Sequence, residues 1–260
     1  MSHFVSGPGA IDLSVVLPVH NEELGIAAVV DEWLARLSSR DITFEIILCE
    51  DGSTDRTKEV LQQLAASRSY LRLDSVARRR GYGPALTSGI LKARGRYVLT
   101  SDSDGQVDPE RLWRLWDRRE AYDALMGVRA PRHDPAARLF ISRAFGLYHR
   151  LLFGTRLRDP SSSFVLIETA KARRILPLLG FLREGYWWGF AGAAIKLDLR
   201  IGEVEIGHRK RLAGSSRVYT PLRLPGIAMR NAIGLSRLRF ARVQPETRIS
   251  ILSRPGKARA

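Results

Sequence analysis

Two aspartates separated by a single residue are the first feature of the sequence that could do chemistry. Asp102 and Asp104 follow a short apolar run, and Gly105 and Gln106 come directly after them. Two carboxylates so placed can share a hard divalent cation, Mg2+ or Mn2+, that bridges to the phosphates of a substrate. A solvated turn rich in Asp and Gly has the same composition, so the pair alone leaves both interpretations open.

Two more polar clusters could bind a ligand. The first contains His20, Asn21 and Glu22, and the second runs from Asp51 to Asp55. Asp51 could accept hydrogen bonds from a ribose or a base, and Glu22 could bind a nucleoside. Alternatively, the second cluster is a turn followed by a helix cap, and Glu22 only favours a helix N-terminus through the helix dipole.

The elements that must position these clusters alternate between strands and helices. Short apolar runs predict strands, and apolar residues at helical spacing predict the helices between them. Strands are expected at 12–19, 44–48, 70–73, 97–100 and 124–128, and helices at 22–37, from about 54 to 66, at 81–92 and from 108 onward. This alternation predicts an α/β fold with a mostly parallel sheet and helices on both faces. All three polar clusters then fall at the carboxyl edge of the sheet, where such folds bind ligands.

Taken together and in this order, the three clusters resemble the family 2 glycosyltransferases of the GT-A type. The resemblance is carried by the segments 15–23, 50–57 and 102–104. It implies a GT-A, Rossmann-like fold and an inverting enzyme that uses a nucleotide sugar together with Mg2+ or Mn2+. The segment 81–89 matches the family's glycine-spaced helix, although its glycines could simply serve close helix packing.

Later motifs are similar to those of dolichyl-phosphate and polyprenyl-phosphate mannose synthases, and the resemblance covers roughly residues 12–218. The run 101–110 is similar to their D-A-D-L-Q-H-P-P-E, apart from Gly105 and Asp108. Further similar segments are Gly127-Val-Arg129, Ser142-Arg143, the D-P-x-S-G-F-like 159–164 and the R-x-x-G-x-S-K-like 211–217. Within these, Ser163 stands in place of the glycine and Arg217 in place of the lysine.

The resemblance assigns roles to particular residues of this sequence. The nucleotide sugar would be bound by Pro18, His20, Glu22, Asp51, Asp102 and Asp104. The metal and the donor diphosphate would be held by Asp102, Asp104 and Gln106. The phosphates of donor or acceptor would be contacted by Arg129, Arg143, Ser162, Arg211 and Arg217, and guanidinium groups suit phosphate oxygens. The residues expected to act in catalysis are Asp104, Arg129 and Arg143.

The aromatic segment 184–190 bears on the acceptor. It has no Asp or Glu after its tryptophans until Asp198, whereas a hydroxyl acceptor needs a base to take its proton. A lipid phosphate is already an anion and needs no strong base. We therefore expect transfer of a hexosyl unit from GDP-mannose or a UDP-hexose to a polyprenyl phosphate. A family 2 enzyme acting on a hydroxyl of a glycan or lipid is the alternative, and the aromatic residues could line an acceptor groove or pack in the core.

The net charge of +15 is concentrated near the end of the chain. The segment from Arg209 to Ala260 holds 13 of the 42 Lys and Arg residues and one of the 27 Asp and Glu residues, so it carries +12. The rest of the chain carries only +3, which argues against a non-enzymatic nucleic-acid-binding protein, the second alternative, because such proteins usually place a basic patch on their folded face.

The same segment suggests a division of the chain and a location. We expect a glycosyltransferase domain at 1–218 and a basic, partly apolar tail at 219–260. Its stretch 227–243 could lie on an anionic membrane surface, bind a small membrane partner, or pack on the body as a helix. The sequence has no apolar run as long as a membrane span, no visible signal peptide and one cysteine. Together these predict a cytoplasmic protein bound peripherally to the cytoplasmic face of the membrane.

Overall fold

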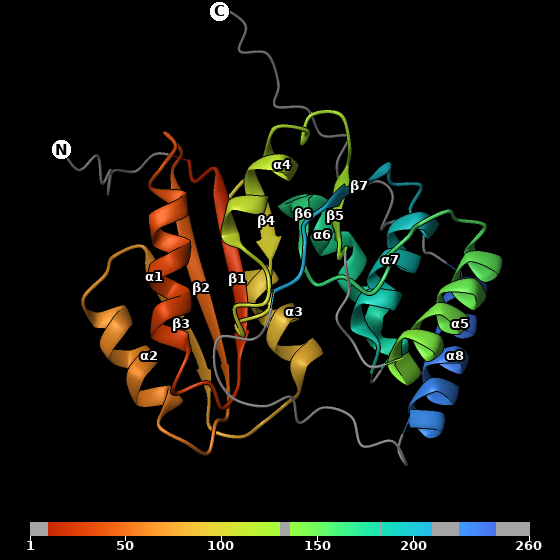
Figure 1. Ribbon diagram of the computed structural model, residues 1–260, viewed down its shortest axis with the longest axis horizontal. Coiled ribbons are helices and arrows are strands. Elements are labelled where there is room, and N and C mark those ends of the chain that lie inside the picture. The colour runs from red at the N-terminus through yellow and green to blue at the C-terminus, as the bar shows by residue number, and fades with distance from the viewer. Residues whose placement is uncertain (1–9, 131–135, 183, 210–223, 243–260) are drawn as a thin grey trace, which may run out of the picture.

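A mixed sheet of seven strands runs through the middle of the part of the chain that the structure describes (Figure 1). The computed structural model describes residues 10–130, 136–182, 184–209 and 224–242. In the strand order β3-β2-β1-β4-β6-β5-β7, all neighbours are parallel except those of β6, which confirms the predicted mostly parallel α/β fold. The strands are β1 (Leu13–Val19), β2 (Phe44–Asp51), β3 (Leu71–Val76), β4 (Tyr97–Thr100), β5 (Ala124–Val128), β6 (Val165–Glu168) and β7 (Ile201–Glu205).

Helices cover both faces of this sheet, as predicted. Their apolar side chains form two clusters, one on each face. The first cluster contains α1 (Ile26–Leu37), α2 (Thr57–Ala66) and α4 (Leu112–Trp116), which follows the short turn η1 (Pro109–Arg111). The second contains α3 (Tyr82–Lys92), α6 (Thr169–Ile175), η2 (Leu176–Phe181), α7 (Tyr186–Lys196), α8 (Leu224–Phe240) and the end of α5 (Ala136–Phe153).

The side chains of β1 show why helices lie on both sides. Leu13, Val15 and Leu17 belong to the cluster with α1, whereas Val16 belongs to the cluster with α3. Successive side chains of a strand point to opposite faces, and all residues of β1 are buried. An apolar run without alternation is therefore the expected pattern of a central strand.

Strand β6 runs antiparallel between β4 and β5, and neither β6 nor β7 was among the predicted strands. Thr100, at the end of β4, pairs with Val165, at the start of β6. The carboxyl end of β4 and the amino end of β6 therefore lie at the same edge of the sheet. As a result, the motif at 159–164 reaches the edge that carries Asp102.

The glycine-spaced helix α3 packs closely on the sheet. A Cβ atom on Gly89 would come within 2.4 Å of Cγ1 of Val16 and 2.5 Å of Sγ of Cys49. Both neighbours belong to the core cluster on that face, so neither side chain can move away freely. Burial of Cys49, the single cysteine of the sequence, raises the pKa of its thiol to about 12.

Helices α5, α7 and α8 lie at the end of the molecule opposite α2 (Figure 1). The Tyr148 hydroxyl of α5 donates to the carbonyl oxygen of Ala232 in α8 at 3.0 Å, and Leu235 and Leu238 of α8 are fully buried. Part of the predicted basic tail is thus a helix packed on the body, one of the arrangements that the sequence left open. Among the described residues, no helix has both the length and the apolar character needed to cross a bilayer.

His149 of α5 is fully buried beneath α7. Its Nε2–H donates to the carbonyl oxygen of Trp188 at 3.1 Å, and among the described residues Nδ1 has no hydrogen-bond partner. Desolvation lowers the pKa of His149 from 6.5 to about 4, because a proton on Nδ1 would place a positive charge in a buried position where water cannot solvate it.

We expect this histidine to make the free energy of unfolding depend on pH. Below pH 6.5 the unfolded chain binds a proton at His149 that the folded chain excludes, so stability is lost as the pH falls from about 6.5 toward about 4. Urea unfolding at pH 7 and pH 5 should show a smaller pH-dependent loss for His149→Gln than for the original chain. An equal loss in both proteins would contradict a buried neutral imidazole.

Candidate functional site

The loop after β4 presents its two aspartates at the carboxyl edge of the sheet. Two bonds join this loop to β1: the Ser103 hydroxyl donates to the carbonyl oxygen of Pro18 at 2.8 Å, and the backbone N–H of Ser101 donates to that of Val16 at 3.2 Å. Both serines are buried, whereas Asp102 and Asp104 are half-buried. Serines and aspartates thus alternate along residues 101–104. The serines hold the loop against β1, while the aspartate carboxylates remain accessible to solvent.

Asp102 is held by two hydroxyl groups from distant parts of the chain. The Tyr82 hydroxyl donates to Oδ1 at 2.6 Å, and the Ser163 hydroxyl donates to Oδ2 at 2.7 Å. Nε1–H of Trp187 donates to the Tyr82 hydroxyl at 2.8 Å. Desolvation and the neighbouring Asp102 carboxylate raise the pKa of Tyr82 well above 10, so its hydroxyl stays protonated. We call Asp102, Tyr82, Ser163 and Trp187 the Asp102 network.

Asp51 joins the second polar cluster to this network through the start of α3. Its Oδ1 accepts the backbone N–H of Arg80 and its Oδ2 that of Gly81, both at 2.8 Å. Gly81 is followed directly by Tyr82, so one stretch of backbone lies between Asp51 and Asp102. Gly52 is required for this approach: its φ is +62°, and a Cβ atom would lie 2.4 Å from the backbone nitrogen of Arg79.

The first polar cluster is bonded to the second. Nδ1 of His20 lies 3.1 Å from the carbonyl oxygen of Asp51, the Asn21 N–H donates to the Ser53 hydroxyl at 3.1 Å, and the Glu22 N–H donates to that of Thr57 at 2.8 Å. Asn21 has a φ of +56°, a conformation that asparagine tolerates better than most residues. The loops after β1 and β2 thus form one unit at the edge, beside the loop after β4.

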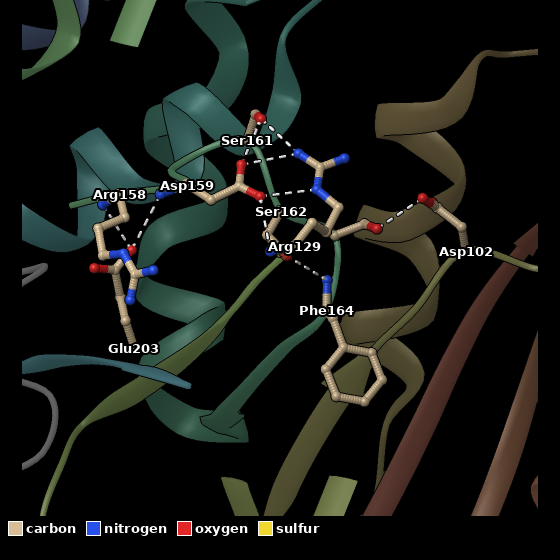
Figure 2. A network of polar contacts seen from close by, with 9 residues as sticks. Asp102, Arg129, Arg158, Asp159, Ser161, Ser162, Phe164 and Glu203 are labelled. Carbon is tan, nitrogen blue, oxygen red and sulfur yellow. Dashed lines mark hydrogen bonds and ion pairs between the residues drawn. The ribbon is translucent and has the colours of Figure 1, made fainter. Parts of the chain in front are cut away.

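Arg129 makes a forked ion pair with Asp159 (Figure 2). Its Nε donates to Oδ2 and its Nη2 to Oδ1, both at 2.8 Å, and Nη2 also donates to the Ser161 hydroxyl at 2.7 Å. The side chains of Arg129 and Asp159 are only 16% and 5% exposed. Arg129, expected to contact phosphate, is therefore placed by the structure in a largely buried pair that orders the motif 159–164.

Ser162, also expected at a phosphate, is fully buried inside this turn. Its N–H donates to the carbonyl oxygen of Asp159 at 3.1 Å, and its hydroxyl accepts the N–H of Phe164 at 3.3 Å. Figure 2 shows Ser162 between Asp159 and Phe164, with Asp102 at the margin of the same group. The turn brings the next residue, Ser163, to Asp102.

The remaining predicted residues lie in three places. The backbone N–H of Gln106 donates to Oδ1 of Asp104 at 3.1 Å, so both belong to the loop after β4. Arg143 is exposed on α5, and no hydrogen bond or ion pair found among the described residues joins it to Asp102 or Asp51. Arg211 and Arg217 lie outside the described residues.

Arg209 is a residue of this edge that the sequence did not single out. Its Nε donates to the carbonyl oxygen of Gly105 at 2.6 Å, and its guanidinium forms an ion pair with Glu32 of α1. The Glu32 carboxylate raises the pKa of Arg209, so the charge is permanent. Arg209 therefore fastens the loop of the two aspartates to α1. Its position just before the R-x-x-G-like motif was the feature of the sequence that could have pointed to this role.

The donor set at this edge fits a hard cation shared with a phosphate. Asp102 and Asp104 offer half-buried carboxylate oxygens, which Mg2+ and Mn2+ prefer. In the described part of the chain, however, no three His, Cys, Asp or Glu side chains gather as a metal-binding group. Mg2+ is commonly held by one or two carboxylates together with substrate phosphates, so a pair suffices if the substrate brings a diphosphate.

The sequence matches a known family over more than half of its length. The family described as Glycosyl transferase family 2 matches residues 14–176. An undecaprenyl-phosphate 4-deoxy-4-formamido-L-arabinose transferase of Pseudomonas aeruginosa is 33% identical over 227 residues, covering 84% of this chain and 63% of that protein. A dolichyl-phosphate beta-glucosyltransferase of Dictyostelium discoideum is 30% identical over 216 residues, covering 75% and 66%. The chain thus spans less than two thirds of the length of either relative.

Solved structures share the fold. Glucosyl-3-phosphoglycerate synthase from Mycobacterium tuberculosis, in complex with Mn2+, UDP and glucosyl-3-phosphoglycerate, has a TM-score of 0.60 at 25% identity, covering 88% of this chain and 80% of that one. S. aureus TarS in complex with UDP-GlcNAc has a TM-score of 0.58 at 19% identity, covering 85% and 65%. Together with the mostly parallel sheet, these likenesses show a GT-A fold.

Proposed function

Because the chain belongs to glycosyl transferase family 2, we propose that it moves a sugar from a nucleotide sugar to the phosphate of a polyprenyl phosphate lipid. The observation that carries the proposal is the carboxyl edge of the sheet, where the start of α3 lies between Asp51 and Asp102. A nucleoside near Asp51 and a diphosphate near Asp102 and Asp104 would lie along this edge in the order in which a nucleotide sugar presents them.

The acceptor is supported by the names of two relatives. The transferase of Pseudomonas aeruginosa and that of Dictyostelium discoideum differ in their sugars, but both names include a polyprenyl phosphate, undecaprenyl or dolichyl. The names of the two relatives do not state the nucleotide of the donor. Both solved structures, however, were obtained with UDP or a UDP-sugar. Of the two expected donor classes, we therefore favour a UDP-hexose over GDP-mannose.

The reaction needs no strong base from the protein. An oxygen of the acceptor phosphate, already ionised, attacks C1 of the sugar from the side opposite the diphosphate. The bond from C1 to the diphosphate oxygen breaks, its electron pair leaves with the nucleoside diphosphate, and the anomeric centre inverts. Mg2+ or Mn2+ held by Asp102 and Asp104 would offset the charge that builds on the departing diphosphate. The protein aligns the two reactants and holds these carboxylates in place.

A transfer assay with matched acceptors tests this function. UDP-glucose and GDP-mannose, each radiolabelled in the sugar, are incubated with the protein, Mn2+ and either undecaprenyl phosphate or undecaprenol. We expect label to enter the lipid fraction with undecaprenyl phosphate alone, and with one donor in preference to the other. Equal transfer to undecaprenol would support the hydroxyl-acceptor alternative, and no transfer from either donor to either acceptor would count against the proposal.

We further propose that α5 and α8 place the protein on a membrane surface, where its lipid acceptor resides. Five apolar side chains of these helices are between 46% and 77% exposed: Leu147, Leu151, Met229, Ile233 and Phe240. Arg237, Arg239 and Arg242 are exposed beside those of α8, and residues 224–242 contain no acidic residue. Apolar and cationic groups together suit the headgroup region of an anionic membrane.

Binding to liposomes checks this placement. Fully burying one large apolar side chain is worth about 1.5–3 kcal/mol, so the double variant Ile233→Ser/Phe240→Ser should partition at least about tenfold less into phosphatidylglycerol-containing vesicles. The control is Leu91→Ser/Tyr122→Ser, which removes two exposed apolar side chains elsewhere on the surface. Equal losses in the two double variants would contradict a role for α8.

A further inference from the structure

The Asp102 network contains two hydroxyl groups that have no assigned role in the transfer. We infer that Tyr82 and Ser163 are positioning residues, which hold the Asp102 carboxylate in the orientation that receives the metal ion. This inference rests on the proposed function, because it assumes that Asp102 is a metal ligand. In this role the two residues act through Asp102, to which each is hydrogen-bonded.

The first step of the argument is the geometry of the two bonds. Tyr82 donates to one carboxylate oxygen and Ser163 to the other, at 2.6 Å and 2.7 Å. Tyr82 belongs to α3 and Ser163 to the turn before β6, so the donors approach from separate elements. Rotation of the carboxylate about its own axis would break both bonds, and the pair therefore fixes the plane of the group.

The direction of the Tyr82 proton is also fixed. The indole N–H of Trp187 can only donate, and it points at the Tyr82 hydroxyl oxygen at 2.8 Å. The hydroxyl thus accepts from Trp187, and its one proton is left for Asp102. The Tyr82 ring is held as well, since it lies edge-on to the ring of Tyr186 with 6.4 Å between centroids.

Ser163 is anchored by its backbone as well as by its side chain. Its carbonyl oxygen accepts the Thr100 hydroxyl at 2.8 Å, which ties it to the last residue of β4, two residues before Asp102. Ser163 is buried, so water competes little for its hydroxyl. In the motif that residues 159–164 resemble, a glycine stands here, and a glycine could not supply this bond.

Because Tyr82 and Ser163 are uncharged donors, the Asp102 carboxylate can still bind a cation. A carboxylate has about four lone-pair sites, and Tyr82 and Ser163 use one on each oxygen. Because neither donor is charged, Asp102 keeps its negative charge, which a lysine or arginine partner would offset. Groups that orient a metal ligand in this way typically change metal affinity by about 10–100-fold when they are removed.

The test measures Mn2+ affinity directly. Free Mn2+ is titrated by electron paramagnetic resonance with the full chain in the presence of UDP, and in a second series GDP. We expect Tyr82→Phe and Ser163→Ala each to raise the Mn2+ dissociation constant about tenfold, and the double variant to raise it at least as much as either. Both substitutions keep the bulk of the side chain and remove only a hydroxyl.

Two matched variants control for the loss of a hydrogen-bonded hydroxyl. Ser14→Ala removes a bond of 2.6 Å from a buried serine to the Glu45 carboxylate, and Tyr148→Phe removes the bond from α5 to α8. Neither residue belongs to the carboxyl edge beside Asp102. They should lower thermal stability and leave the Mn2+ dissociation constant unchanged, whereas a merely structural role of Tyr82 and Ser163 would give the same pattern for all four variants.

The possible results separate the inference from the function on which it rests. If the original chain binds Mn2+ with a nucleotide but Tyr82→Phe and Ser163→Ala bind it equally well or more tightly, the positioning role is overturned and the proposed function stands. If the original chain binds no Mn2+ with UDP or GDP, the metal role of Asp102 falls, and the positioning role falls with it.

Discussion

Replacing Asp104 by asparagine is expected to lower kcat/KM for sugar transfer at least about a hundredfold, because a hard-metal ligand loses its charge and metal stabilisation of a leaving group is worth several kcal/mol. The fold should be unaffected. Oδ1 of Asp104 accepts the backbone N–H of Gln106, and the amide oxygen of asparagine can accept the same bond. The measurement is transfer of labelled sugar at saturating Mn2+, together with the melting temperature.

Asp108→Asn is the matched control for this prediction. Asp108 lies four residues further along, and its carboxylate accepts the N–H of Glu110 at the start of η1. The same change of charge outside the pair of aspartates should leave kcat/KM within about twofold, because the amide oxygen of asparagine can accept the same bond from Glu110. Full turnover by Asp104→Asn would remove the carboxylate from the mechanism.

A large loss of stability is expected when the buried ion pair between Arg129 and Asp159 is broken. Asp159→Asn removes the carboxylate that pairs with the largely buried Arg129 guanidinium, and breaking such a pair by removing one partner costs about 3–5 kcal/mol. The free energy of unfolding, measured in urea, should fall by this amount. Transfer should fall with it, because the turn that carries Ser163 is ordered by the same carboxylate.

An exposed pair of the same type provides the comparison. Arg40 and Asp117 also form two hydrogen bonds, but their side chains are 40% and 56% exposed. Solvent screens such a pair, and Asp117→Asn should cost at most about 1 kcal/mol. Similar losses in Asp117→Asn and Asp159→Asn would mean that burial does not set the strength of the Arg129 pair.

The first half of the fold could be predicted from the sequence because local signals determine it. The apolar run of β1 and the spacing of Ile26, Val30 and Trp33 in α1 report burial directly, and the alternation of strands and helices then fixes a parallel sheet. Strand β6 could not be predicted in the same way. The place of Val165–Glu168 between β4 and β5 depends on antiparallel pairing with strands far away in the sequence, which the alternation of strands and helices does not predict.

The candidate site, too, could be predicted from the sequence only in part. The sequence grouped Asp51 and Asp102 because both follow strands of the predicted sheet, and the structure brings them to either side of the start of α3. It could not predict that Arg129 is paired with Asp159, because motif spacing does not say which side chain an arginine meets. The hydroxyls of Tyr82 and Ser163 were unpredictable for the same reason: each meets Asp102 across a long separation in sequence.

The burial of Cys49 has a practical consequence. Because burial raises its pKa to about 12, almost none of this thiol is ionised at neutral pH. Alkylating reagents react with the thiolate, so they should not modify Cys49. It is also the single cysteine in the sequence. A fluorophore could therefore be attached at one chosen position, for example after Leu151→Cys or Phe240→Cys, without first removing a native cysteine. Quenching of such a dye by spin-labelled lipids would then report how deeply each helix enters a bilayer.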